Sequence, residues 1–144
     1  MHSIFKFISL LANSQRRYID HLAADKEYSG AQGKLIHYLF THQHTTVHQK
    51  DIEKAFGLRA PTATELLKSL EKKELIQKVP DKNDARYKSI HLTALAEKYR
   101  DDVFHDMEHL ESRLTDNISE DELKIWIQVS HKMLTNLAGG KNEI

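Results

Sequence analysis

Hydroxyl-bearing and cationic side chains share one face of a predicted helix near the middle of the chain. Apolar residues recur at three- and four-residue intervals over positions 63–70, which predicts an amphipathic helix over about residues 61–74. Its opposite face carries short hydroxyls and long cations, side chains suited to the base edges and phosphates of nucleic acid. On an isolated helix such a face is usually only solvated. The candidate nucleic-acid contacts of this helix are Arg59, Pro61, Thr62, Thr64 and Lys68.

A predicted β-hairpin follows this helix and adds further cations. Residues 75–79 alternate as a strand, Pro80 ends it, and residues 87–92 form the returning strand. The polar turn between them places Asp84 two residues before Arg86, where its carboxylate can fix the arginine or the turn. An arginine on a hairpin that protrudes beside a helix favours contact with a narrow minor groove. The candidate contacts of the hairpin are Lys82, Asn83, Arg86 and Lys88, with Asp84 as the residue that stabilises the turn.

A shorter helix precedes this pair of elements. Thr46 and Gln49 match a capping box that would open it, and Gly57 suits the left-handed turn that would end it. The order helix, turn, helix and hairpin is that of a winged helix-turn-helix, which places its second helix in the DNA major groove. The hairpin therefore favours DNA contact over the solvated alternative. The shorter helix offers Gln49, Lys50 and Lys54 as phosphate contacts, and its predicted inward residues are Ile52, Ala55 and Phe56.

Longer helices are predicted on both sides of this region. Apolar spacing predicts a helix over residues 4–24, and Ser29 and Gln32 form a capping box for a second helix. A long helix is expected over residues 94–115, and a capping box at residues 119–122 opens the last one. The predicted fold class is mainly α with a small β-hairpin wing. We expect one domain composed of N-terminal helices (1–40), a winged helix-turn-helix (41–93) and C-terminal helices (94–144).

Composition narrows the class of protein. Apolar residues make up 40% and charged residues 29% of 144 residues, which is typical of a globular chain. Net charge is zero, but residues 44–93 hold ten Lys and Arg against seven Asp and Glu, a modest positive surplus of three. No apolar run approaches the ~20 residues of a membrane span, and the N-terminus lacks the basic start and cleavage site of a signal peptide. We therefore expect a cytoplasmic protein that does not contact a membrane.

Motifs for enzymatic chemistry are missing from the sequence. It contains no cysteine, no nucleophile elbow, no phosphate-binding glycine loop and no zinc-protease motif, so we expect neither catalysis nor a cofactor. His105 and His109 have the four-residue spacing of metal ligands on a helix, although two such histidines are usually ordinary surface residues. A metal-responsive regulator that uses this pair stays open as one alternative. A helical interaction module without DNA binding stays open as another, because the net charge is neutral.

Three segments together resemble the MarR family of bacterial transcriptional regulators. They are LKSLEKKELI in the second half of the predicted recognition helix and at the start of the next strand, DKNDAR in the hairpin turn, and HLTALAEKY leading into the long helix. The resemblance covers nearly the whole chain. It implies a homodimer in which the first, fifth and sixth helices interlock, bound to a double-stranded, pseudo-palindromic operator and typically repressing transcription. It also implies that the helix over residues 61–74 enters the major groove and that Arg86 enters the minor groove.

The chain departs from the family pattern at three positions. Arg59 stands where a polar cap is usual before the recognition helix, and Glu74 stands where a glycine commonly follows it. Glu65 lies on the predicted exposed face, where a carboxylate repels phosphate unless it accepts from a cytosine amino group. These departures bear on the operator sequence more than on DNA binding.

Family members bind small phenolic or carboxylate effectors between the dimer helices and the DNA-binding region. By this resemblance, a small-molecule pocket would use residues of the first two helices. The same side chains also suit the core and the dimer interface, where no ligand is required. The candidate pocket residues are Arg17, Tyr18, His21, His37 and Tyr38.

Overall fold

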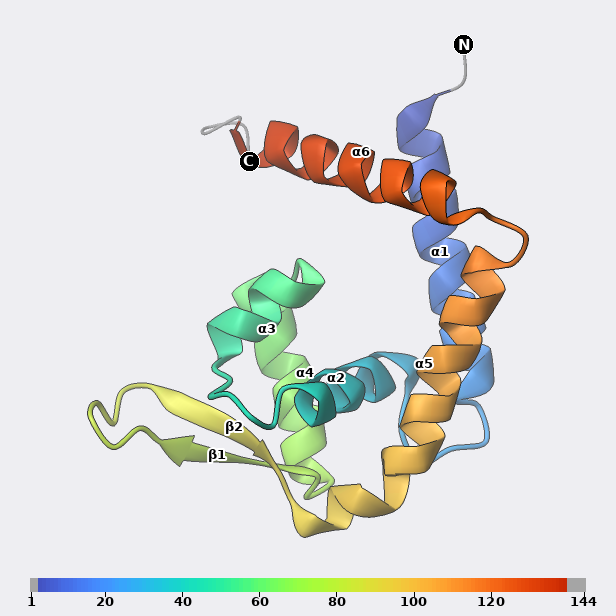
Figure 1. Ribbon diagram of the computed structural model, residues 1–144. Helices are drawn as coiled ribbons and strands as arrows, with labels where there is room; N and C mark the ends of the chain where they lie inside the picture. Colours follow the sequence, from blue (N-terminus) through green and yellow to red (C-terminus); the bar gives the residue numbers. More distant parts are fainter. Residues whose placement is uncertain (1–2, 140–144) are drawn as a thin grey trace. The chain divides into compact units, whose positions relative to one another are not determined.

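The computed structural model describes residues 3–139 and confirms a mainly helical fold with a two-stranded antiparallel hairpin (Figure 1). Residues 1–2 and 140–144 of the predicted terminal segments lie outside the described residues. The chain forms two compact units, Met1–Leu110 and Glu111–Ile144. The elements are α1 (Ile4–Leu22), α2 (Gly30–Thr41), α3 (Gln49–Phe56), α4 (Ala60–Lys72), β1 (Ile76–Pro80), β2 (Lys88–Leu92), the short 3₁₀ helix η1 (Ala94–Tyr99), α5 (Arg100–Thr115) and α6 (Glu120–Gly139).

The core of the first unit joins helices, hairpin and the start of α5. Apolar side chains that are wholly removed from water come from α2, α3, α4 and α5, so each of these elements depends on the others. Burying one such side chain stabilises the fold by roughly 1.5–3 kcal/mol. The largest of them are Leu35, Ile36, Ile52, Leu67, Leu70 and Val103.

The predicted capping box at the start of α2 is confirmed. The Ser29 hydroxyl accepts from the Gln32 backbone N–H at 3.2 Å, and the Gln32 side-chain oxygen accepts from the Ser29 N–H at 2.9 Å. Two N–H groups that the first helical turn would leave unpaired are thereby satisfied.

The predicted capping box at Thr46 and Gln49 is wrong. Helix α3 begins at Gln49, and Asp51 accepts from the backbone N–H of His48, the N-cap residue, at 2.8 Å. The chain before His48 cannot be helical because it is extended beside the hairpin. There the Val47 carbonyl accepts from the Ile90 N–H at 2.8 Å.

Helix α3 has only eight residues, and this limits what it can bury. Ile52 is fully buried and Phe56 packs partly against the core, as predicted, but Ala55 is exposed. Gly57 ends the helix with φ of 63°, the left-handed conformation predicted for it.

Helix α4 begins and ends without the residues usual at those positions. Pro61 lies in its first turn as predicted, and the Arg59 side chain makes no capping hydrogen bond. The helix ends at Lys72, two residues earlier than predicted. Glu74 follows with φ of 62°, a left-handed conformation that glycine adopts more easily.

The predicted single helix over residues 94–115 is divided into η1 and α5. Positions three apart align in a 3₁₀ helix, so Ala96 and Tyr99 face the core together. Ala96 is fully buried, and the Tyr99 ring meets Tyr28 edge-on with centroids 5.8 Å apart. Core packing thus selects the tighter helix here.

A buried polar contact joins α5 to the connection between α1 and α2. The Tyr28 hydroxyl donates to the Asp106 carboxylate at 2.9 Å, and Lys26 Nζ lies 3.7 Å from the same carboxylate. Asp106 is only 4% exposed, and such a buried charge requires partners of this kind. Burial and the neighbouring carboxylate raise the pKa of Tyr28 above its usual range.

In the second unit, the predicted capping box before α6 is confirmed. Glu122 accepts from the Ser119 backbone N–H at 3.0 Å, and the Ser119 hydroxyl accepts from the Glu122 N–H at 3.1 Å. The backbone hydrogen bond to Ser119, with that of its side chain, holds the pKa of Glu122 below its usual range.

Candidate nucleic-acid interface

Helix α4, which corresponds to the predicted recognition helix, presents a polar face opposite its buried one. Ala63, Leu67 and Leu70 are buried, whereas the predicted contacts Arg59, Pro61, Thr62 and Lys68 are exposed and Thr64 is half-buried. Glu65 is exposed on the same helix, as expected.

Three polar contacts hold helix α4 in place, and sequence spacing predicts none of them. Gln32 Nε2 donates to the Ser69 hydroxyl at 2.9 Å, and Lys73 Nζ donates to Gln32 Oε1 at 2.7 Å. Lys78 of β1 lies 3.5 Å from the Glu71 carboxylate. Helix α4 is thereby linked to α2 on one side and to the hairpin on the other.

The hairpin β1–β2 forms the predicted wing, shifted by one residue. Ile76 pairs with Leu92 and Pro80 pairs with Lys88, so Pro80 is the last residue of β1 instead of lying beyond it. Proline is tolerated there because this strand is at an edge of a two-stranded sheet. The turn leaves Lys82 and Asn83 exposed.

Arg86 and Asp84 form a close pair at the tip of the wing. The Arg86 Nε and Nη2 atoms donate to the two carboxylate oxygens at 3.1 and 2.8 Å, and the Arg86 backbone N–H donates at 3.0 Å. The Arg86 side chain is nonetheless 86% exposed. Its guanidinium holds the pKa of Asp84 below its usual range, so the pair is charged at neutral pH.

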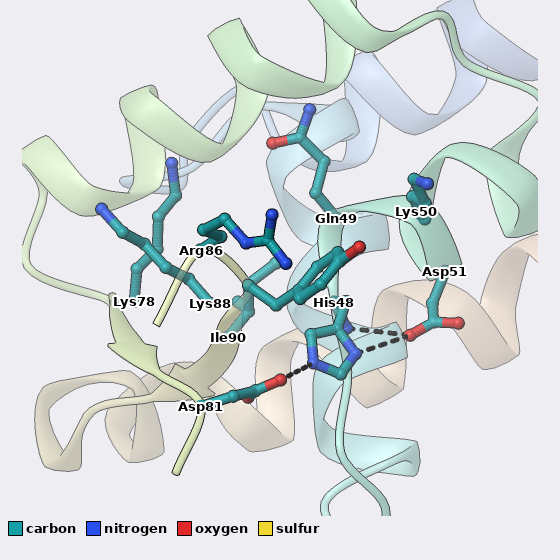
Figure 2. Close-up of a pocket in the computed structure, with 10 residues that line it drawn as sticks. His48, Gln49, Lys50, Asp51, Lys78, Asp81, Arg86, Lys88 and Ile90 are labelled. Carbon is teal, nitrogen blue, oxygen red and sulfur yellow. Dashed lines mark hydrogen bonds and ion pairs between the residues drawn. The ribbon is translucent and has the colours of Figure 1, made fainter. Parts of the chain in front are cut away.

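An open cleft of about 610 Å³ separates the start of α3 from the wing (Figure 2). Four of its lining side chains are cations that come from different elements: Lys50, Lys78, Arg86 and Lys88. The structure thus brings a predicted phosphate contact of α3 to the same cleft as two predicted contacts of the wing.

His48 closes one side of this cleft. Figure 2 shows its ring between Asp81 and Asp51, and the His48 Nε2 atom lies 2.8 Å from Asp81 Oδ2. This contact ties the start of α3 to the base of the wing. The two residues are 33 positions apart, and nothing in their spacing predicts the contact.

The predicted effector-pocket residues lie on α1 and α2 with separate neighbours. The Tyr18 hydroxyl is 2.8 Å from His109 Nδ1, the Arg17 guanidinium donates to Ser14, and His21 is exposed. His37 meets Phe104 edge-on with ring centroids 4.8 Å apart, and Tyr38 stacks on His42 at 3.9 Å. Burial, with His42 nearby, lowers the pKa of His37 below its usual range.

The histidine pair of the metal alternative has few partners for a metal. The rings of His105 and His109 have centroids 6.3 Å apart, and His109 already contacts Tyr18. Over residues 3–139, no three histidine or carboxylate side chains form a group that could hold a metal ion.

None of the helices within the described part of the chain is both long and apolar enough to cross a membrane.

Comparisons with known proteins agree with this geometry. The model of the MarR family matches residues 32–88, which extend from the start of α2 into β2. None of the curated protein sequences matches the chain. Many solved structures do match it.

Three solved structures illustrate the range of similarity. The transcription regulator MarR from Oenococcus oeni PSU-1 is 25% identical, with 92% of this chain and 98% of that chain covered and a TM-score of 0.82. S. aureus MepR in complex with DNA is 27% identical, with 94% of this chain and 96% of that chain covered and a TM-score of 0.84. The heme sensor PefR from Streptococcus agalactiae, in complex with heme, is 26% identical over the whole of both chains, with a TM-score of 0.59.

The winged helix-turn-helix, the family match and the likeness to a DNA-bound relative point to one class of protein. The three structures named above are of a transcription regulator, of MepR bound to DNA and of a heme sensor. The family match over residues 32–88 and the fold shared with MarR and MepR make this chain similar to the MarR-type winged-helix transcriptional regulators.

Proposed function

We propose that this protein is a homodimeric repressor whose two copies bind a pseudo-palindromic operator. The observation that carries the proposal is that α4 and the wing flank the start of α3. Gln49 lines the cleft shared with Arg86 and also contacts Thr64 of the recognition helix. One continuous surface therefore joins the predicted major-groove and minor-groove contacts.

Each part of this surface has its own role on DNA. Helix α4 enters the major groove with Pro61, Thr62, Thr64 and Lys68, and Arg86 enters the adjacent minor groove. The other cations of the wing and of α3 neutralise phosphates, so affinity falls steeply as salt rises. Two recognition helices engage half-sites about one helical turn apart, ~10 base pairs centre to centre. These cations of the wing and of α3 are Lys50, Lys54, Lys82 and Lys88, and Arg59 before α4 and Asn83 in the wing turn are further DNA contacts.

Apolar surfaces on α1 and α6 support the homodimer. Phe5 on α1 is 70% exposed and Trp126 on α6 is 59% exposed, each with other exposed large apolar residues on the same helix. Clusters of this kind mark interaction surfaces, whereas single exposed apolar residues are ordinary. The segments 1–40 and 94–144 thus serve dimerisation, and residues 41–93 serve DNA binding. The other exposed apolar residues are Ile4, Ile8, Leu10 and Leu11 on α1, and Ile125, Ile127, Leu134 and Leu137 on α6.

A small-molecule effector completes the proposal by releasing the DNA. The support is the similarity to a ligand-binding sensor, PefR, and the presence of ring and guanidinium side chains on α1 and α2. An effector with a phenolic or carboxylate group suits Tyr18, His37 and Arg17 in hydrogen bonding and charge.

Fluorescence anisotropy with a labelled duplex from upstream of the protein's own gene tests the central proposal. We expect saturable binding of two chains per duplex, with a dissociation constant that rises steeply between 50 and 200 mM salt, as phosphate neutralisation requires. A scrambled duplex of equal length and composition is the control. A monomer, or a dimer that binds neither this duplex nor any other at low salt, would contradict the proposal.

A further inference from the structure

The Gln49 amide bridges α3 and the recognition helix α4. Its Nε2 atom lies 3.0 Å from the Thr64 hydroxyl oxygen, 3.3 Å from the Ala60 carbonyl oxygen and 3.2 Å from the Glu53 carboxylate. A carbonyl and an ionised carboxylate can only accept hydrogen bonds, so the nitrogen of the amide, not its oxygen, must face them. The orientation of the amide is therefore determined by its surroundings.

This orientation determines how the Thr64 hydroxyl is used. An amide nitrogen donates and does not accept, so the Thr64 oxygen accepts from Gln49. Within the described residues the Thr64 hydroxyl then has no acceptor for its own proton. Ser69 on the same helix differs, because its hydroxyl already donates to the Leu66 carbonyl at 2.6 Å.

We propose that Gln49 is a positioning residue that holds Thr64 as a hydrogen-bond donor toward a base edge in the major groove. The inference rests on the proposed function, because it requires α4 to lie in that groove. Guanine, adenine and thymine each offer an acceptor there, whereas cytosine offers only its amino donor. Thr64 therefore disfavours cytosine at the base that it faces. The neighbouring residue Glu65 cannot act as a donor of this kind, since its carboxylate only accepts hydrogen bonds.

A selection on random duplexes, with sequencing of the bound fraction, tests this assignment. The wild-type protein should show one operator position at which cytosine is depleted by about two- to tenfold, the size of one net neutral hydrogen bond. Thr64→Val removes the hydroxyl with little change in shape and should abolish that depletion. Thr64→Ser retains a hydroxyl that Gln49 can orient and should keep it.

Gln49→Met separates positioning from contact. Without the amide, the Thr64 hydroxyl is free to rotate and donate to its own helix, so cytosine depletion should disappear although Thr64 is still present. The double variant that combines Gln49→Met with Thr64→Val should lose no more cytosine depletion than either single variant. Thr62→Val is the matched control, because among the described residues no hydrogen bond joins Thr62 to Gln49, so its effect should add to that of Gln49→Met.

Three results would overturn the assignment. Cytosine depletion that persists in Thr64→Val would show that another residue excludes cytosine, and depletion that persists in Gln49→Met would show that Thr64 does not need Gln49 to position it. A loss of affinity spread equally over all duplexes would place the Thr64 hydroxyl on a phosphate. If the wild-type protein itself selected no duplex, the proposed function would fail together with this inference, and that result is distinct from the other two.

Discussion

At the scale of single residues, a carboxylate at the wing tip orders the long side chain of an arginine two residues later. Asp84 accepts from both the guanidinium and the backbone N–H of Arg86, and both contacts are made within two residues. Ordering an arginine side chain costs up to about 2 kcal/mol of conformational entropy. Asp84 already restricts Arg86 in the free protein, so less of that cost would remain for the proposed DNA contact. This pair is also the part of the interface that the sequence predicts most directly.

Arg86→Ala should weaken binding to the operator by roughly 1–3 kcal/mol, because a groove contact and its charge are both lost. Anisotropy titrations of the operator duplex at fixed salt measure the change. Lys82→Ala is the control. Loss of a phosphate contact should weaken binding to all duplexes equally and should lower the slope of log K against log salt by about one. An unchanged dissociation constant in Arg86→Ala would remove this residue from the interface.

Glu65→Gln should tighten binding to duplexes of random sequence by a few-fold. The carboxylate is exposed on α4, and its removal relieves repulsion from nearby phosphates. The gain should shrink as salt rises, because screening weakens the repulsion. Titrations at two salt concentrations against a random duplex measure this. Weaker binding to every duplex would mean that Glu65 does not lie against phosphate.

His37 predicts part of the pH dependence of stability. Burial holds its pKa below the ordinary value of about 6.5, so the unfolded chain binds the proton more readily than the folded one. The free energy of unfolding should therefore fall as the pH drops from about 6.5 toward the folded-state pKa. His37→Gln should lose less stability than the wild-type protein between pH 7.5 and 5.5 in urea unfolding. Equal losses in the two proteins would refute this role.

At the scale of secondary-structure elements, the predictions succeed where the determining contact is local. The Ser29 cap of α2, Gly57 after α3 and Pro61 in α4 were all predicted correctly, because each depends on residues at most a few positions away. The start of α3 and the division into η1 and α5 were not. They depend on the hydrogen bond from Ile90 to Val47 and on the packing of Tyr99 against Tyr28.

The candidate site follows the same rule. Its exposed cations could be predicted from helical periodicity and from the hairpin turn. The ties that hold those elements could not, because they join residues far apart in sequence: Gln32 with Ser69, Gln49 with Thr64, and His48 with Asp81. No periodic pattern records such pairs.

Asp81→Asn should loosen the wing from the start of α3. The substitution keeps the shape of the side chain but removes the charge that faces His48 Nε2. Amide hydrogen exchange at Ile90, whose N–H donates to the Val47 carbonyl, should become faster, while amides of α1 should exchange as before. Unchanged exchange at Ile90 would show that the strand contacts alone hold the wing.

At the scale of the whole molecule, the apolar surface of α1 predicts the oligomeric state. Phe5→Glu with Leu10→Glu places two charges where the proposed homodimer buries apolar side chains, so the protein should sediment as a monomer. Operator affinity should fall by at least tenfold, because two linked recognition helices bind more tightly than one. Ser9→Glu, an exposed polar position on the same helix, should remain dimeric. If the doubly substituted protein were still a dimer, the dimer interface would have to lie elsewhere than at Phe5 and Leu10.

The buried hydrogen bond between Tyr28 and Asp106 bears on how the protein is made. It spans 78 positions, and the nearby core also requires Val103. A nascent chain that has left the ribosome only as far as the wing still exposes Tyr28 and the apolar core residues around the position of Val103 to water. Folding of the first unit must therefore wait until α5 has left the ribosome. We therefore expect a fragment that stops after the wing to be a protease-sensitive polypeptide and not a DNA-binding domain that folds on its own.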